Sequence, residues 1–207
     1  MFITFEGIEG SGKTTQVALL HDYLVKKGYS VIKTREPGGT MFGETLRKIF
    51  LEPKLHVFPL SELLVFMAMR AQHVEEVIMP ALQDRKIVLC DRFVDATYAY
   101  QGYGRGIDLG IIETLNRLVT KGIRPNLTVL LDCNVDRGFR RKTVLSPSMD
   151  RFEKEAVTFH RKVKKAYVKF SKEDPKRFFV VDGRGSIEDI HEIIREKVEK
   201  LLKNYGI

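Results

Sequence analysis

The chain has few cysteines and no long apolar run, and both shortages narrow its class. Cys90 and Cys133 are the only two cysteines among 207 residues. Each ends an apolar run predicted to be a buried strand, so we expect reduced structural thiols in a cytosolic protein rather than a disulfide or a metal site. No apolar run has the length and low charge of a transmembrane helix. A basic segment like that of a signal peptide is also missing from the N-terminus, which predicts a cytoplasmic protein with no membrane partner.

Acidic residues are outnumbered by basic ones, which gives a net charge of +8. A basic surface is compatible with binding to nucleic acid or membrane, and equally with a site for two polyanionic small molecules. The main basic run lies on a predicted helix and comprises Arg161, Lys162, Lys164, Lys165, Lys169 and Lys172. It carries no aromatic RNA-binding motif. We therefore interpret it as a solvated helix face and expect no nucleic-acid partner.

A glycine-rich stretch near the N-terminus is the most informative part of the sequence. It follows a β-rich run that starts at Phe2 and precedes a helical pattern, and it matches G-x-x-x-x-G-K-[ST], the phosphate-binding P-loop. The loop's backbone N–H groups and the helix N-terminus favour phosphate. Lys13 adds a mobile positive charge, and Thr14 offers a hydroxyl to Mg²⁺. We predict that this loop binds the phosphates of ATP, with Mg²⁺ as cofactor. Its residues are Gly7, Ile8, Glu9, Gly10, Ser11, Gly12, Lys13, Thr14 and Thr15.

Strand-like and helical segments alternate over the rest of the chain. Further strands are predicted at 29–34, 86–91, 127–131 and 178–181. Helices are predicted at 41–50, 59–82, about 92–119 with an interruption at 101–106, 135–142, 151–171 and 186–202. The sequence shows no internal repeat and no interdomain linker. This pattern predicts one α/β domain over residues 1–207, a three-layer P-loop fold whose five-stranded parallel sheet is flanked by helices.

Polar groups follow the predicted strands, at the sheet edge where ligands of α/β proteins gather. They comprise the P-loop, the turn at 35–40, Asp91 with Arg92, Asp132, and the segment at 182–185. The guanine-reading Asn-Lys-x-Asp of GTP-binding switches is absent from the sequence. The remaining features fit a small-molecule kinase.

Over nearly its full length the chain resembles the thymidylate kinase family. The matching stretches are Phe5–Thr15, Thr34–Thr40, Phe66-x-x-x-Arg70, Asp91-Arg92-Phe93 and Ala99–Gln101 with Gly102. The resemblance implies a homodimer and a transferase that moves the γ-phosphoryl group of ATP to dTMP with Mg²⁺, giving dTDP for dTTP synthesis. The apolar helix at 59–82 either crosses the core or packs on a second subunit.

Acceptor-side roles follow from the same resemblance. Phe66 and Arg70 share one helix face because they are four residues apart, and family members use them to stack on thymine and to reach a base carbonyl. Arg92 resembles the arginine that grips the dTMP phosphate. The other expected dTMP ligands are Glu9, Thr97, Tyr98 and Gln101, with Glu36 and Arg47 as weaker candidates. Asp91 is expected to assist Mg²⁺ beside Thr14.

Each assignment has a structural alternative. Phe66 alone is compatible with core packing, and Asp91 with Arg92 is compatible with a surface ion pair. Arg70 is harder to explain structurally, because a charge in an apolar helix needs a partner. Ala96 departs from the family, which often has serine there.

Catalysis is expected to depend on cations rather than on a general base. The acceptor phosphate has a second pKa of about 6 and is already a nucleophile at neutral pH. Family members carry assisting arginines in the P-loop or in a lid, and this P-loop has none. We therefore predict a short lid at about 137–152, from which Arg141 and Arg151 reach the transferring phosphoryl group beside Lys13, Arg92 and Asp91. A solvated charged loop is the alternative.

Two other functions remain open from the sequence. One is a different nucleoside monophosphate or deoxynucleoside kinase. The other, more remote, is an ATP-dependent module that binds nucleic acid without transferring phosphate.

Overall fold

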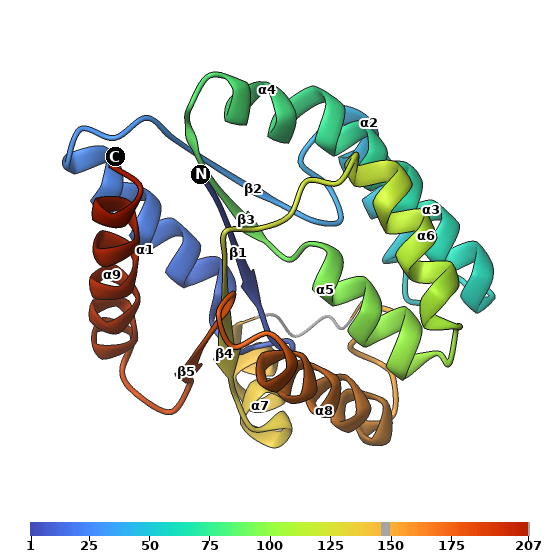
Figure 1. Cartoon of the computed structure of the whole chain (residues 1–207). Helices are drawn as coiled ribbons and strands as arrows, with labels where there is room; N and C mark the ends of the chain where they lie inside the picture. The colour runs from blue at the N-terminus through green and yellow to red at the C-terminus, as the bar shows by residue number, and fades with distance from the viewer. Residues whose placement is uncertain (146–149, 207) are drawn as a thin grey trace.

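A single five-stranded sheet organises the computed structural model, which describes residues 1–145 and 150–206, with side chains 142–145 left out (Figure 1). All its strand pairs are parallel, in the order β2-β3-β1-β4-β5. The strands are β1 (Phe2–Glu6), β2 (Val31–Arg35), β3 (Ile87–Asp91), β4 (Leu127–Asp132) and β5 (Phe178–Asp182). The predicted fold class is confirmed.

Helical segments connect the strands and cover both faces of the sheet. They are α1 (Lys13–Lys26), α2 (Met41–Phe50), α3 (Pro59–His73), η1 (Val74–Ile78), α4 (Met79–Gln83), α5 (Val94–Thr97), η2 (Tyr98–Gly104), α6 (Leu109–Thr120), α7 (Val135–Leu145), α8 (Val157–Glu173) and α9 (Ile187–Asn204). Of these, η1 and η2 have the wider π-helical turn.

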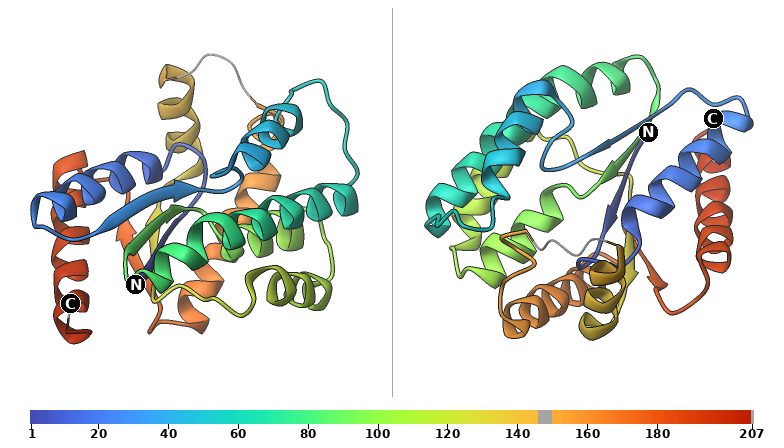
Figure 2. Two further views of the ribbon diagram at one scale, coloured as in Figure 1. Left: turned by 90° about the horizontal axis from the view of Figure 1, so that it is seen from above. Right: turned by 180° about the vertical axis from the view of Figure 1, so that it is seen from behind.

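The alternation of side chains along each strand produces two cores. Ile3, Phe5 and Leu89 face α1 and α9, where they pack with Leu20 and Ile194. The other side of β1 and β3 packs on η1 and α4 through Phe2, Val88 and Ile78, whereas α8 covers β4 and β5. Figure 2 shows α1 and α9 together on one side of the sheet. A sheet covered on both faces explains why its strands are almost uniformly apolar.

Strand register brings three loops together at the carboxyl edge. Asp91 at the end of β3 is in register with Phe5 on one side and with Arg35 on the other. The P-loop, the turn after β2 and the Asp91–Phe93 segment therefore leave the sheet side by side. Helix α3 lies between α2 and α6, beyond this edge.

The predicted helix at 59–82 is interrupted by a widened turn. Within η1, the Met79 N–H bonds to the carbonyl of Val74, five residues back. Pro80 follows at once, and proline can neither donate the next helical bond nor fit against the carbonyl four residues before it. The helix continues as α4 after this turn.

The segment around the predicted lid also differs from expectation. Helix α7 runs to Leu145 rather than 142, and the rest of the predicted loop includes residues 146–149, outside the described residues. Residues 151–156 form turns instead of helix, because Asp150 Oδ1 accepts from the backbone N–H groups of Phe152 and Glu153. Among the described residues, no helix combines the length and apolarity that crossing a membrane requires.

Candidate active site

The P-loop connects β1 to the N-terminus of α1. Gly12 occupies the position before the helix with φ +100°, which a side chain rarely permits. The Lys13 ammonium donates to the carbonyls of Ile8 at 2.7 Å and Gly7 at 3.1 Å. Burial, with Arg92 nearby, lowers the pKa of Lys13 to about 8. The amine is thus held where phosphate oxygens are expected.

Helix α7 approaches the tip of this loop so closely that backbone meets backbone. A Cβ on Gly10 would lie 2.0 Å from the carbonyl oxygen of Gly138, and a Cβ on Gly138 would lie 2.4 Å from that of Glu9. Neither position has room for a side chain. The start of α7 is therefore fixed directly against the loop.

Thr14 and Asp91 form a pair of hard oxygen donors beside the P-loop. The Thr14 hydroxyl donates to Asp91 Oδ2 at 2.6 Å. Mg²⁺ prefers oxygen ligands and is commonly held by one or two protein groups together with substrate phosphates. This pair has the chemistry and position for that arrangement, although the described residues contain no ready-made cluster of three metal-binding side chains.

Arg92 links the P-loop to Tyr100 on η2. Its backbone is left-handed, with φ +70°. Its guanidinium donates to the Gly7 carbonyl at 2.9 Å and to Glu9 Oε1 at 3.1 Å, and it lies 4.9 Å from the Tyr100 ring centre. Tyr100 also donates to Glu9 Oε1, at 2.6 Å. Burial would raise the pKa of Glu9, but Arg92 and the neighbouring donors hold it well below its usual value.

A buried carboxyl group supports this unusual backbone. Glu6, at the end of β1, has no exposed surface. It accepts from the Phe93 backbone N–H at 2.8 Å and from the Tyr167 hydroxyl at 2.7 Å. It therefore holds the residue that follows Arg92. Burial and the nearby Asp95 raise the pKa of Glu6 to about 7.

The other end of the site is organised by Arg70. Its Nε donates to Glu36 Oε2 at 2.7 Å, and its two Nη atoms donate to Thr97, Asn116 and the Phe93 carbonyl. Glu36 Oε1 lies 3.0 Å from His73 Nδ1. Burial tends to raise the pKa of Glu36, but Arg70 and His73 lower it overall. This charge in an apolar helix is thus fully paired.

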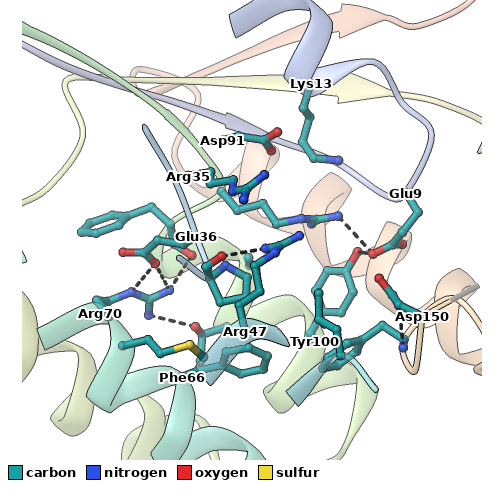
Figure 3. Close-up of a pocket in the computed structure, with 18 of the residues that line it drawn as sticks. Glu9, Lys13, Arg35, Glu36, Arg47, Phe66, Arg70, Asp91, Tyr100 and Asp150 are labelled. Atoms are coloured by element: carbon teal, nitrogen blue, oxygen red, sulfur yellow. Dashed lines mark hydrogen bonds and ion pairs between the residues drawn. The ribbon is translucent and has the colours of Figure 1, made fainter. Parts of the chain in front are cut away.

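These groups surround one pocket of about 230 Å³. In Figure 3, Lys13, Asp91 and Glu9 lie at one end, and Phe66 and Arg70 lie toward the other. Positive and negative groups alternate along the walls, and the deeper end has an aromatic ring. A phosphate chain and a planar, polar ring would be held at opposite ends of such a pocket.

Most of the predicted site residues line this pocket. They are Glu9, Gly10, Lys13, Thr14, Glu36, Phe66, Arg70, Asp91, Arg92, Thr97 and Gln101, together with the weaker candidate Arg47. Gly7, Ile8, Ser11, Gly12 and Thr15 belong to the loop around Lys13 without lining the pocket.

Three predicted residues lie elsewhere. Tyr98 packs beside α3 and α6 in a separate apolar cluster, because η2 turns it away from the pocket. Arg151 donates to Glu62 Oε2 at 2.7 Å and to the Phe50 carbonyl, so its guanidinium is held away from the P-loop. Arg141 donates to the Gly183 carbonyl at 3.2 Å, near the segment after β5.

Several lining residues escaped the sequence reasoning. Asp150, Phe152 and Glu153 line the pocket from the turn before α8, and Phe152 lies 5.7 Å from Phe66, ring to ring. Arg35 and Leu51 contribute from the sides. The sequence 150–153 had been assigned to a helix and a lid, and no local pattern signals that it returns to the pocket.

The comparisons with known proteins agree with one another. A family model described as thymidylate kinase matches residues 5–194. Among curated proteins, a thymidylate kinase of Pelobacter propionicus is 51% identical over 98% of this chain and 94% of that protein. One from Kosmotoga olearia is 47% identical over 100% of this chain and 99% of that protein. The crystal structure of a thymidylate kinase from Ehrlichia chaffeensis is 38% identical, with a TM-score of 0.80 over 96% of this chain and 98% of that one.

Glu6 makes the stability of the protein dependent on pH. Its pKa is raised on folding, so the folded state keeps the proton to higher pH than the unfolded state. Stability is therefore lost as the pH rises from about 4.5 through about 7. Glu6→Gln removes this loss while preserving an acceptor for Phe93. Urea unfolding should show the wild type losing stability relative to Glu6→Gln between pH 5 and pH 8, and a constant difference would contradict the assignment.

Proposed function

The chain belongs to the thymidylate kinase family, and we propose that it transfers the γ-phosphoryl group of ATP to dTMP, giving dTDP and ADP for dTTP synthesis. One observation on this chain's own pocket supports the proposed reaction independently of family membership. A single pocket has the P-loop lysine and the Thr14–Asp91 pair at one end, and Phe66, Thr97 and Gln101 at the other. The two substrates can therefore meet end to end.

In this proposal the P-loop binds the ATP phosphates. Backbone N–H groups of residues 7–15 and the Lys13 ammonium bind the outer phosphates, and Lys13 exchanges its contacts with the Gly7 and Ile8 carbonyls for phosphate oxygens. Thr14 and Asp91 are the proposed Mg²⁺ ligands, directly or through water. The chemistry that Mg²⁺ would supply at Thr14 and Asp91 is partial neutralisation of the phosphate charge.

Arg92 and Glu9 are assigned to the acceptor. Arg92 is held by Gly7 and Glu9, so it presents a fixed fork to the dTMP phosphate. Glu9, which stays ionised beside it, accepts from the deoxyribose hydroxyl. The phosphate is already nucleophilic, so positioning and charge neutralisation supply the catalysis.

The base is assigned to the apolar end. Phe66 stacks on thymine, and the ring of Phe152 lies 5.7 Å from the ring of Phe66. Thr97 accepts from Arg70, which leaves its own proton to donate to a base carbonyl. Arg70 lines the same wall and reaches a base carbonyl by exchanging one of its Nη contacts for it, while its Nε stays bound to Glu36. Tyr98 is not among the proposed dTMP ligands, because it packs in the apolar cluster beside α3 and α6.

Arg141 is the proposed lid arginine. It follows Gly138, where α7 touches the P-loop, by three residues, and in this proposal its guanidinium leaves the Gly183 carbonyl for the transferring phosphoryl group. Arg151 is better explained as an anchor for residues 150–153, because Phe50 and Glu62 accept from its Nε and Nη1. Residues 146–149 of the predicted lid, at 137–152, lie outside the described part of the chain.

We further propose a homodimer formed through α2, α3 and α6. Exposed apolar side chains recur at helical spacing on this surface: Phe42 and Ile49 on α2, Leu60 and Leu64 on α3, and Ile111 and Leu118 on α6. The three helices pack side by side, with α3 in contact with both α2 and α6, and exposed apolar side chains on neighbouring helices favour an interaction surface. A second copy of the same face would cover it.

The setting we propose is cytoplasmic, without a nucleic-acid partner. Cys90 and Cys133 are unpaired and buried, as is usual in a reducing compartment. Part of the basic α8 face is neutralised within the chain, since Lys164 pairs with Asp132 and Lys169 with Glu173.

A coupled assay of ADP release across dTMP, dUMP, dCMP, AMP and GMP tests the reaction. We expect kcat/KM to be highest for dTMP and turnover to stop when EDTA removes divalent metal, because charge between two anions is then unscreened. Preference for any other acceptor would replace the proposal by another nucleotide kinase. Tight, salt-sensitive nucleic-acid binding without acceptor-dependent ADP release would favour a binding module.

Arg141→Ala should lower kcat by roughly a hundredfold, the loss expected when one transition-state donor is removed. Its exposed neighbour provides the matched control, and Arg140→Ala should stay within a few-fold of wild type. Arg151→Ala should chiefly lower stability, because it leaves buried Glu62 with one cation fewer. Equal kcat values for Arg141→Ala and Arg140→Ala would remove Arg141 from the mechanism.

Leu118→Glu should convert the proposed dimer to monomers, since it places charge in the apolar face. Leu118 is 73% exposed, so the substitution should not unfold the chain. Ile193→Glu on α9, away from this face, is the control and should leave the mass unchanged. Sedimentation velocity at micromolar protein measures both, and a monomeric wild type would refute the dimer.

A further inference from the structure

Glu62 is a fully buried carboxylate that lies outside the pocket and has no role in the steps above. It belongs to α3, one turn before Phe66. Four contacts saturate it. Oε1 accepts from Gln101 Nε2 at 2.8 Å and from Arg105 Nε at 3.1 Å. Oε2 accepts from Arg105 Nη2 at 3.1 Å and from Arg151 Nη1 at 2.7 Å.

These contacts determine how the Gln101 amide is oriented. A carboxylate bound by two guanidinium groups can only accept, so the amide nitrogen of Gln101 must face it. The carbonyl oxygen of the amide is then the group that remains for the pocket, which Gln101 lines. Gln101 is 2% exposed, so little water competes with Glu62 for its amide nitrogen. An uncharged partner at position 62 would allow both orientations.

We propose that Glu62 is a positioning residue that makes Gln101 an obligatory hydrogen-bond acceptor and so selects bases carrying an N–H at ring position 3. This inference rests on the proposed function, because it concerns the acceptor base of that reaction. Thymine and uracil donate from N3, whereas the N3 of cytosine only accepts. Two acceptors facing each other leave both unpaired, so the cytosine nucleotide is rejected.

The same carboxylate connects this specificity to the segment at 150–153. Arg151 is enclosed by Glu62, the Phe50 carbonyl and the Phe152 ring, whose centre is 4.5 Å from its guanidinium. Phe152 in turn lines the pocket and packs against Phe66, with 5.7 Å between the ring centres. Glu62 thus orients Gln101 directly and positions Phe152 through Arg151.

The test uses Glu62→Gln, which keeps the shape of the side chain but can donate. Its amide oxygen should stay with Arg151, and its nitrogen should face position 101, so that Gln101 turns over and presents N–H to the base. The ratio of kcat/KM for dTMP to that for dCMP should fall about tenfold or more, the effect of one mispaired buried hydrogen bond. The ratio of dTMP to dUMP should not change, because both bases carry the N3 proton. If dCMP turns over too slowly, its inhibition constant against dTMP replaces kcat/KM.

A double variant gives the decisive result. In Glu62→Gln with Gln101→Glu, the carboxylate at 101 can only accept and should restore the preference for dTMP over dCMP. Arg105→Gln is the matched control, since it removes one cation from Glu62 but preserves the Gln101 contact; it should lower the urea midpoint and leave the ratio unchanged.

Ratios measured on one preparation cancel any loss of folded enzyme, so general destabilisation cannot imitate the effect. Equal loss on dTMP and dCMP in Glu62→Gln, or no recovery in the double variant, would overturn the role of Glu62. A wild type inactive on dTMP would instead refute the proposed function.

Discussion

The contact between Arg92 and the P-loop is the interaction on which the rest of the site depends. One guanidinium binds the Gly7 carbonyl and Glu9, so the loop proposed to bind ATP and the residue proposed to bind the acceptor phosphate are joined directly. The left-handed backbone of Arg92 makes this possible, and it costs free energy at a non-glycine residue. The Phe93 N–H, bound to buried Glu6, holds the chain in that conformation. Phosphoryl transfer between two anions needs such fixed positions more than it needs a base.

Three buried carboxylates follow the same logic. Glu6 supports Arg92, Glu36 holds Arg70, and Glu62 holds Arg151 together with Gln101. Each carboxylate has more than one donor, which burial demands, because an unpaired charge in the interior is strongly destabilising. An apolar residue could fill the same volume, but it could not set the direction of a guanidinium or an amide. Burial of charge therefore gives this pocket walls whose donors and acceptors are fixed before a ligand arrives.

The geometry also explains how one pocket treats the two ends of an acceptor differently. At the proposed phosphate end, Lys13, Arg92 and Asp91 lie at the carboxyl edge of the sheet, where the strand register sets their separation. At the proposed base end, Phe66, Thr97 and Gln101 come from helices that pack beyond that edge. The sheet therefore positions the charged side chains, and the packing of α3 on η2 and α6 positions the side chains proposed to contact the base. A change in helix packing can therefore alter selectivity without disturbing the phosphate site.

The sequence by itself determined the α/β class, the P-loop and most of the pocket lining, because these depend on patterns within a few residues. Alternating segments predicted the sheet, the P-loop motif placed Lys13, and the resemblance to the family placed Arg70, Arg92 and Gln101. Tertiary structure alone decided where long side chains point. It turned Tyr98 away through the π-helical turn, bound Arg151 to Glu62, brought Phe152 back to the pocket, and set Gly138 against Gly10. Each of these contacts joins residues from separate elements, and which partner a flexible side chain meets depends on how those elements pack. The neighbouring residues in the sequence do not determine that partner, so only the folded structure identifies it.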